Sequence, residues 1–364
     1  MTSSAFSQFL ATRSAAGIDV APGITTPQYF SGAEREHLAT RRAAGLFDFS
    51  FMGCVEIAGA GSLDFLHCLQ TRSLTELAHG RIAYTLLLRD DASVMIDATV
   101  WHLERDHYWL FVGRRRDCAE IMQAAGPFAV AVKDLSSLHA VLAIQGSASR
   151  GIIERAFGQT CLPALPYFGF KQFDFSGHAC WLARLGYSGE TGYELVIADA
   201  AAPALWQALL TAGEGAGLLE CGFDAIDTLR IEAGHILFTH ELTSGVSPAE
   251  LGMTRRVDFY GRDFRGAQAL QAQRWRTPSR RLVGLLPENY AAMDVGNAAH
   301  INAGGAIITS VCRSPLFNRE LALGFVHTAD ACPGSLVRLP SGARASVTRL
   351  PFYDPARALP RRVV

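Results

Sequence analysis

Apolar residues recur three and four positions apart in several segments of the chain, which is the spacing of one face of an α-helix. The clearest case is 199–211, where four large apolar side chains form a stripe behind Asp199, a residue suited to cap the start of a helix. The same spacing predicts helices over 33–44, 61–70, 116–125, 147–157, 199–211 and 223–232.

Elsewhere apolar and polar positions follow the pattern of β-strands. Residues 282–353 are strand-rich with regular Gly and Pro turns, which indicates a small barrel or sandwich, and 268–281 predicts a linker or surface helix. In the first 30 residues, Gly and Pro are expected to break any helix. The pattern predicts an α+β fold of mixed β-rich modules rather than repeated βαβ units. The predicted strands before residue 282 are 54–58, 84–88, 94–103, 108–112, 128–132, 140–146, 170–175, 180–185 and 193–197.

The composition limits the class of protein. The chain has 364 residues, of which 49% are hydrophobic, so it can build several cores. Its formal net charge is −1, whereas a nucleic-acid-binding protein would show a basic excess, so no nucleic-acid partner is expected. There is no signal peptide and no run of about 18 apolar residues, so the sequence predicts a cytoplasmic protein with no membrane partner.

Most common signatures of nucleotide, nucleophile and metal chemistry are absent. The chain has no glycine-rich nucleotide loop, no nucleophile elbow and no Cys-x-x-Cys pair among its eight cysteines. His240 and Glu241 begin a zinc-type motif, but the second histidine is missing, and His235 lies five residues before His240. We therefore expect no metal site.

The segment Leu185–Glu194 stands out because it holds three glycines between two predicted strands, which predicts a tight loop. Tyrosines and glutamates flank these glycines. Two interpretations stay open on chemistry alone. The segment is either a hairpin with a solvated Glu190, or a ligand loop whose backbone approaches a flat ring while a tyrosine packs on it and a carboxylate binds its edge.

Asp97 is the second unusual position, because it lies inside the otherwise apolar stretch 94–100. A carboxylate there is either on the solvated face of a strand or buried with a perturbed pKa, as at many functional sites. Alternation puts Met95, Asp97 and Thr99 on one face. On pattern alone, this arrangement favours the solvated face.

Several longer stretches resemble one protein family, in the same order along the chain, from about residue 33 to 362: these are 43–59, 84–100, 185–197, 227–253, 263–270, 307–325 and 350–362. The family is that of the glycine-cleavage T-protein, or aminomethyltransferase, which includes folate-dependent demethylases. The resemblance implies a three-lobed fold around a central tetrahydrofolate site, with a C-terminal β-barrel. It implies a first folate-binding lobe from 1–50 and 140–250, a second from 51–139, and a linker and barrel from 251–364.

The resemblance also implies roles for single residues. Asp97 matches an aspartate beside the reactive nitrogens of the folate, where a poorly solvated carboxylate helps to control charge and protons. Glu194 matches a glutamate that binds the pterin edge, whose adjacent N–H groups suit two parallel hydrogen bonds to one carboxylate. Tyr187 matches a tyrosine that lines the site. The other positions that match residues near the cofactor are Met52, Tyr84, Trp101 and Arg362.

The chain departs from the family pattern at several positions. A family arginine associated with the folate site is Ile226 here, and an asparagine after a strand is Gly113. A family His-Met-Gly reads Phe51-Met52-Gly53. Because the folate-side residues are kept while these positions differ, we predict a tetrahydrofolate-dependent demethylase or methyltransferase that acts on a small N-, O- or S-methyl compound. Ile226 and His235 would then shape the substrate site.

Other functions of the same fold stay open. The first alternative is the aminomethyltransferase of a glycine cleavage system, which takes its aminomethyl donor from a lipoyl carrier protein. The second is a non-catalytic folate-binding protein, although the Lys-Gly-Cys-type motif of the iron–sulfur-assembly branch is absent and Phe238–Glu241 stands in that region. A site that binds another flat ring is the third.

Overall fold

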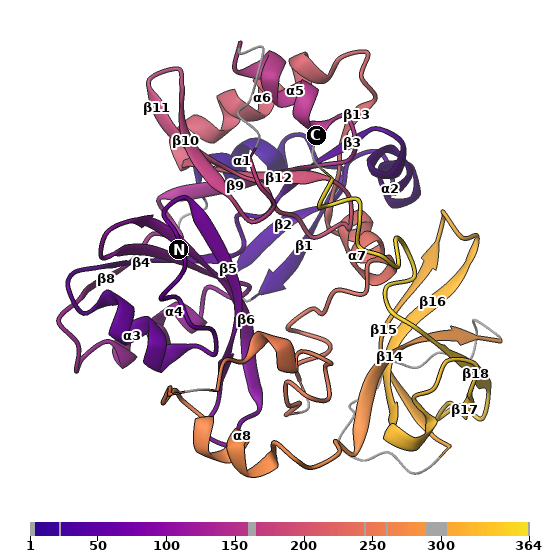
Figure 1. Cartoon of the computed structure of the whole chain (residues 1–364). Helices are drawn as coiled ribbons and strands as arrows, with labels where there is room; N and C mark the ends of the chain where they lie inside the picture. Colours follow the sequence, from indigo (N-terminus) through magenta and orange to yellow (C-terminus); the bar gives the residue numbers. More distant parts are fainter. Residues whose placement is uncertain are drawn as a thin grey trace.

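The computed structural model describes residues 4–21, 23–158, 165–243, 245–259, 261–288 and 304–362. Three larger sheets, with helices packed beside them, make up most of the molecule (Figure 1). The first is a six-stranded sheet in the spatial order β10-β11-β12-β9-β3-β13. Its strands are β3 (Ala44–Asp48), β9 (His139–Gln145), β10 (Phe170–Phe175), β11 (His178–Ala183), β12 (Gly192–Ala198) and β13 (Leu218–Glu220).

Helices cover this first sheet because their apolar stripes are buried against it. The core beneath them joins Phe6, Ile153 and Trp206 to apolar residues of the sheet. A separate two-stranded hairpin precedes the sheet in sequence. The elements of this part are α1 (Ala5–Ala11), β1 (Ala16–Ala21), β2 (Ile24–Tyr29), α2 (Ala33–Arg42), α5 (Ser149–Ala156), η1 (Asp199–Ala201), α6 (Ala202–Gly213) and α7 (Phe223–Glu232).

The second sheet has five strands in the order β5-β6-β7-β4-β8. One core, which includes Phe47 and Ala143 of the first sheet and Trp101 and Phe111 of the second, binds the two sheets together. The longest strand of this sheet, β6 (Val94–Glu104), contributes Trp101 to this core, so one of its faces is directed toward the first sheet. The elements are β4 (Gly53–Ala58), α3 (Ser62–Leu69), β5 (Arg81–Leu88), β6 (Val94–Glu104), β7 (His107–Val112), α4 (Asp117–Ala124) and β8 (Ala131–Asp134).

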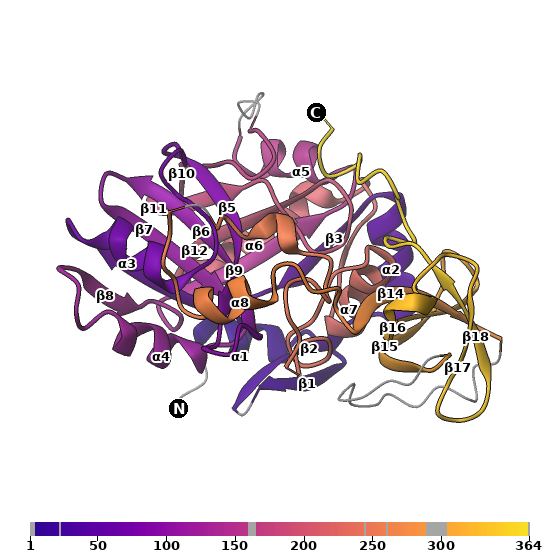
Figure 2. The ribbon, with the colours of Figure 1, turned by 60° about the horizontal axis from the view of Figure 1, so that its bottom comes forward.

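The third sheet has the order β15-β16-β14-β18-β17 and lies to one side of the other two (Figures 1 and 2). The chain leaves it after β18 and returns to the first sheet, where Thr191 Oγ1 donates to the carbonyl of Leu359 at 2.8 Å. The elements are η2 (Thr254–Arg256), α8 (Ala267–Gln273), β14 (Arg280–Pro287), β15 (Ala306–Ser314), β16 (Arg319–His327), η4 (Thr328–Asp330), β17 (Leu336–Arg338) and β18 (Arg344–Thr348).

The α+β fold class is confirmed, and most predicted elements occur within a few residues of their predicted bounds. The expectation that no helix forms in the first 30 residues was wrong. Helix α1 ends before the first glycine and proline of that region, and the Ser4 hydroxyl caps it by accepting the Ser7 N–H. The strand predicted over 128–132 begins later, at Ala131. The assignment of the sheets to three lobes with the bounds given above stays a prediction.

Candidate active site

A cavity of about 950 Å³ lies where the three sheets meet, at the upper end of the size of small-molecule sites. Its wall combines aromatic side chains with four carboxylates, a histidine and several arginines. Residues from all three sheets and from the C-terminal segment contribute to the wall. The carboxylates are Asp97, Glu194, Asp227 and Asp354.

Asp97 faces this cavity from β6, so the solvated face favoured by the strand pattern is the cavity wall. The Tyr84 hydroxyl, on the neighbouring strand β5, donates to Asp97 Oδ2 at 2.9 Å. Burial raises the pKa of Asp97, and the hydrogen bond from Tyr84 opposes that rise. Asp97 and Tyr84 therefore form a hydrogen-bonded acid pair at the edge of the cavity.

Glu194 lies in β12, in the interior of the first sheet, with strands on both sides. Only 6% of the residue is exposed, and its carboxyl receives no hydrogen bond from any described residue. Burial raises the pKa of Glu194 to about 8. A buried, unpartnered carboxyl that faces a cavity is costly to the protein alone, so it indicates a ligand with N–H donors.

The glycine-rich loop between β11 and β12 is built around Gln145. A Cβ at Gly186 or Gly192 would collide with the Gln145 amide, and Gly189 has a φ of +82°. The Ser188 hydroxyl donates to Gln145 Oε1 at 2.8 Å. The glycines therefore allow the loop to close over Gln145 while Tyr187 and Gly189 line the cavity.

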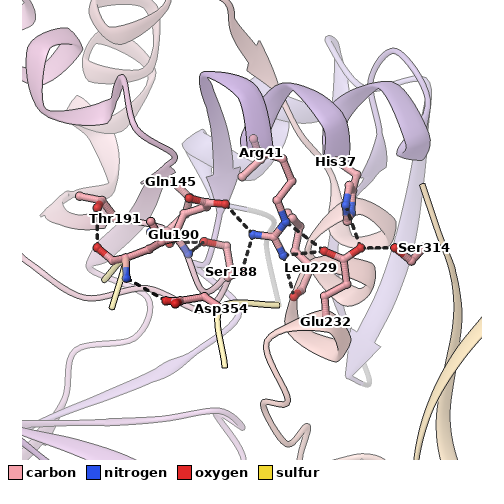
Figure 3. Close-up of polar contacts among 12 residues, drawn as sticks. His37, Arg41, Gln145, Ser188, Glu190, Thr191, Leu229, Glu232, Ser314 and Asp354 are labelled. Carbon is pink, nitrogen blue, oxygen red and sulfur yellow. Dashed lines mark hydrogen bonds and ion pairs between the residues drawn. The ribbon is translucent and has the colours of Figure 1, made fainter. Parts of the chain in front are cut away.

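Glu190 is buried, so the interpretation of a hairpin with a solvated Glu190 is wrong. Its carboxylate pairs with Arg41 Nη1 at 2.9 Å, and Arg41 also binds Glu232 at 2.7 Å (Figure 3). Glu232 in turn contacts His37 and accepts a hydrogen bond from Ser314 of the third sheet. This network ties the loop to α2, α7 and β15, which fixes the position of Tyr187.

His235 lies on the cavity wall and stacks on Tyr187, with ring centroids 5.5 Å apart. Burial, with Arg357 and Arg230 nearby, lowers the pKa of His235 to about 3, so the imidazole is neutral near pH 7. The Tyr187 hydroxyl donates to the carbonyl of Ile236. The pair therefore forms a flat, uncharged wall.

The turn that follows His235 is anchored by Glu241. The Glu241 carboxylate contacts the fully buried Arg230 at 3.1 Å and accepts the backbone N–H of Leu237 at 2.8 Å. Hydroxyl groups of β15 donate to its other oxygen. Glu241 is therefore a structural partner of Arg230. Among the described residues, no group of three His, Cys, Asp or Glu side chains is placed so that it could hold a metal ion.

Part of the cavity wall is apolar. It includes Ile226, Met52 and Phe238, and Phe238 lies over Gly113. A Cβ at Gly113 would be 2.5 Å from Phe238 Cδ1, so the ring fills the space that a side chain at that position would need. Gly113 directly follows β7, whose register with β6 places it beside Asp97. Both departures from the family pattern, Ile226 and Gly113, thus lie at the wall of the cavity.

Two of the predicted site residues do not line the cavity. Trp101 is fully buried behind the wall, where it packs on Phe111 and Phe170 at centroid distances of 4.9 and 5.0 Å. Arg362 is exposed, and its carbonyl accepts a hydrogen bond from Arg184. The sequence reasoning missed the arginines that do line the cavity. They are Arg255, Arg256, Arg349, Arg357 and Arg361.

No helix among the described residues is long and apolar enough to cross a membrane. A second hollow of about 680 Å³, lined by Ser73, Asp258 and Arg262 among others, lies outside the central cavity. It brings together none of the predicted site residues. The chemistry therefore concentrates in the central cavity.

Two protein-family models match this chain. The model of the GCVT N-terminal domain matches residues 6–260, and the model of the glycine cleavage T-protein C-terminal barrel domain matches residues 280–354. A crystal structure of the glycine cleavage system aminomethyltransferase T from Bartonella henselae superposes with a TM-score of 0.83. It is 26% identical, with 95% of this chain and 96% of that chain covered. The fold and the family models together define a one-carbon transferase with the three-lobed T-protein fold and a C-terminal barrel.

Curated relatives agree with this class. An aminomethyltransferase from Streptomyces avermitilis is 36% identical over 339 residues, which cover 88% of this chain and 90% of the relative. One from Moorella thermoacetica is 34% identical over 345 residues, which cover 91% and 92%. The chain therefore belongs to the glycine cleavage T-protein family.

Proposed function

We propose that the central cavity binds tetrahydrofolate and that the protein transfers a one-carbon unit onto it. The observation that carries this proposal is the pair of carboxyl groups that line one cavity, with Glu194 unpartnered and Asp97 bonded to Tyr84. A pterin offers adjacent N–H donors to the first site and a one-carbon acceptor to the second. When bound, tetrahydrofolate supplies the nitrogens that take up the one-carbon unit.

In this proposal Glu194 accepts two parallel hydrogen bonds from the pterin, which are strong because the acceptor is charged. Tyr187 and Met52 are walls of the ring site. Asp97 binds and releases a proton at Oδ2, where Tyr84 orients it at 2.9 Å. Trp101 supports the wall from behind, and Arg357 and Arg361 line the cavity, whereas Arg362 does not.

The relatives' names favour an aminomethyl group as the one-carbon unit. Its donor in this proposal is the lipoyl carrier protein that the family resemblance implies. Aminomethyl transfer would release ammonia and leave methylene-tetrahydrofolate. The lipoyl carrier protein is the first candidate donor because the relatives and the fold both support an aminomethyltransferase. The cytoplasmic location expected from the sequence stays a prediction.

A methylated small compound is the second candidate donor, and the apolar part of the cavity wall favours it. Phe238 occupies the space that a side chain at Gly113 would need, and Ile226 adds hydrocarbon surface to the cavity wall. A methyl group on nitrogen, oxygen or sulfur has no hydrogen-bonding group at its own carbon, so apolar wall groups can accommodate it.

Calorimetric titration with tetrahydrofolate tests the binding site. We expect Glu194→Gln to weaken binding and the exposed Glu214→Gln to leave it unchanged. Wild-type affinity in the Glu194→Gln variant would refute the assignment.

Two turnover assays then separate the donors: ammonia released from an aminomethylated lipoyl carrier, and methyl-tetrahydrofolate formed from a panel of methylated amines, ethers and thioethers. Asp97→Asn should slow whichever reaction occurs. Tight folate binding without either product would favour the non-catalytic alternative.

A further inference from the structure

Three consecutive arginines follow the glycine that ends β7, and each of them has different surroundings. Arg116 is exposed. Arg115 donates to the backbone carbonyls of Ser50 and Met52, so it holds the loop before β4. Arg114 contacts another set of residues, and only 13% of its side chain is exposed. A guanidinium kept from water in this way needs specific partners, which show what it does.

Arg114 is fixed by contacts with three different segments. Its Nε pairs with Asp117 of α4 at 2.8 Å, and its Nη2 donates to the carbonyl of Met95 in β6 at 3.1 Å. Its guanidinium also lies over the Phe238 ring, 5.8 Å from the ring centroid, which is within the range of a cation–π contact. Arginine has many rotamers, so three such contacts hold its charge at one place.

The contact of Arg114 with β6 lies two residues before Asp97. Strands β6 and β7 pair antiparallel, with Ala98 opposite Val112, so the residues that follow β7 lie beside those that precede Asp97. Arg114 itself does not line the central cavity, whereas Asp97 does. Arg114 is therefore placed to act on the carboxyl from within the protein and not on a ligand.

The other titratable and charged groups near Asp97 come from three elements. Tyr84 of β5 donates to its carboxyl, Tyr187 of the glycine-rich loop lies within reach of its charge, and Arg256 of η2 covers the Tyr84 ring at 5.4 Å. Burial raises the pKa of both tyrosines, so they are neutral near pH 7. Burial also raises the pKa of Asp97, and the hydrogen bond from Tyr84 and the positive charge of Arg114 oppose that rise.

We propose that Arg114 is a positioning residue for Asp97. It fixes β6 two residues before the carboxyl and supplies a positive charge that favours the carboxylate form. It also holds the Phe238 ring that forms part of the apolar cavity wall. This proposal rests on the proposed function, because it assigns the group that controls the proton carried by Asp97.

Infrared titration of the free protein tests the charge, because a protonated carboxyl absorbs apart from a carboxylate. The band that is lost in Asp97→Asn identifies Asp97. Arg114→Gln keeps an N–H donor for the Met95 carbonyl but has no charge, so the protonated band should persist to higher pH than in the wild type. Arg114→Lys keeps the charge and should titrate close to the wild type. Arg116→Gln, at the exposed neighbour, is the matched control and should not move the band.

Removal of the Arg114 charge leaves Asp117 without its closer partner, and only 8% of the Asp117 side chain is exposed, so the single variant loses stability. If Arg114→Gln does not fold, Arg114→Gln/Asp117→Asn takes its place with the same expected shift, because it leaves no unpaired carboxylate. An Asp97 band that titrates as in the wild type in the variant without the charge would overturn the proposal. An equal shift in Arg114→Lys would overturn it as well, because the charge would then be irrelevant.

Turnover at saturating tetrahydrofolate separates this role from ligand binding, with the donor that gives product in the two assays above. In the pH range where kcat follows Asp97, Arg114→Gln should differ roughly threefold from the wild type at the same pH. The KM for tetrahydrofolate should stay unchanged, because Glu194 holds the pterin. A raised KM with an unchanged pH profile of kcat would make Arg114 a purely structural residue and refute its assignment.

The infrared titration needs no ligand, so it separates this proposal from the proposed function. If tetrahydrofolate does not bind and the Asp97 band still shifts in Arg114→Gln, the folate assignment fails and the action of Arg114 on Asp97 stands. If tetrahydrofolate binds and the band does not respond to the loss of the Arg114 charge, this proposal alone fails.

Discussion

Titrating tetrahydrofolate into the protein at several pH values tests Glu194 directly, because its carboxyl must lose a proton before it can accept two hydrogen bonds from a pterin. In the free protein, burial raises the pKa of Glu194 to about 8. At pH 7 about nine carboxyls in ten are then protonated, so folate binding should release about 0.9 proton. The protonated form is the one that the free cavity stabilises.

The association constant should follow the ionised fraction of Glu194 in the free protein. It should rise about ninefold from pH 6 to pH 7, about fivefold from pH 7 to pH 8, and about twofold above that. Calorimetry at pH 7 in two buffers with different ionisation enthalpies gives the number of protons released. This readout does not depend on the identity of the one-carbon donor.

Glu194→Gln removes the titrating group and half of its acceptor capacity. We expect a loss of roughly 10- to 100-fold in affinity at pH 8, from the loss of hydrogen bonds to a charged group, and no pH dependence between pH 6 and pH 8. The reasoning would be refuted by wild-type affinity that stays constant over this range with no proton release. It would also be refuted by the same slope in the variant.

The same shift predicts that the free protein loses stability as the pH rises. Because the folded state holds the Glu194 proton more tightly than the unfolded chain, the unfolding free energy of wild type relative to Glu194→Gln should fall by about 3–4 kcal/mol from pH 5 to pH 8, measured by urea denaturation. Gly113→Asn alone should lower the melting temperature, since Phe238 occupies the space that a Cβ at this position needs. Phe238→Ala in the same chain should restore part of that loss. If the double variant instead loses the sum of the two single losses in melting temperature, this reasoning is wrong. Arg230→Met should cost about 3–5 kcal/mol by leaving Glu241 buried without its partner, and Glu241→Gln added to it should recover part of that cost.

The secondary structure and the family could be read from the sequence because both depend on local information. Helical and strand periods depend on the residue order alone, and the matched stretches follow one another at consistent spacing. The roles proposed for Asp97 and Glu194 came from the family resemblance, because the strand pattern alone favoured a solvated Asp97 and left two interpretations of the glycine-rich loop open. Helix α1 was missed because its cap and short apolar stripe lie just before residues that break helices.

The burial of each strand face was not determined by the pattern. A period of two residues says that Met95, Asp97 and Thr99 share a face, but it does not say what covers that face. For Asp97 the covering is a cavity bounded by the other sheets, so the side chain is neither in solvent nor in the core. Glu190 likewise became buried only because Arg41, far away in sequence, meets it.

The sequence by itself therefore determined most of the elements, the family and, through the family resemblance, the two carboxyl groups on which the proposed chemistry depends. The tertiary structure decided which matched residues reach the cavity: Trp101 lies behind its wall, and Arg357 and Arg361 line it where Arg362 was expected. It also showed that Phe238 fills the space above Gly113. The physical reason is that a cavity between three sheets is lined by residues distant in sequence, whose positions depend on how the sheets pack rather than on local residue order.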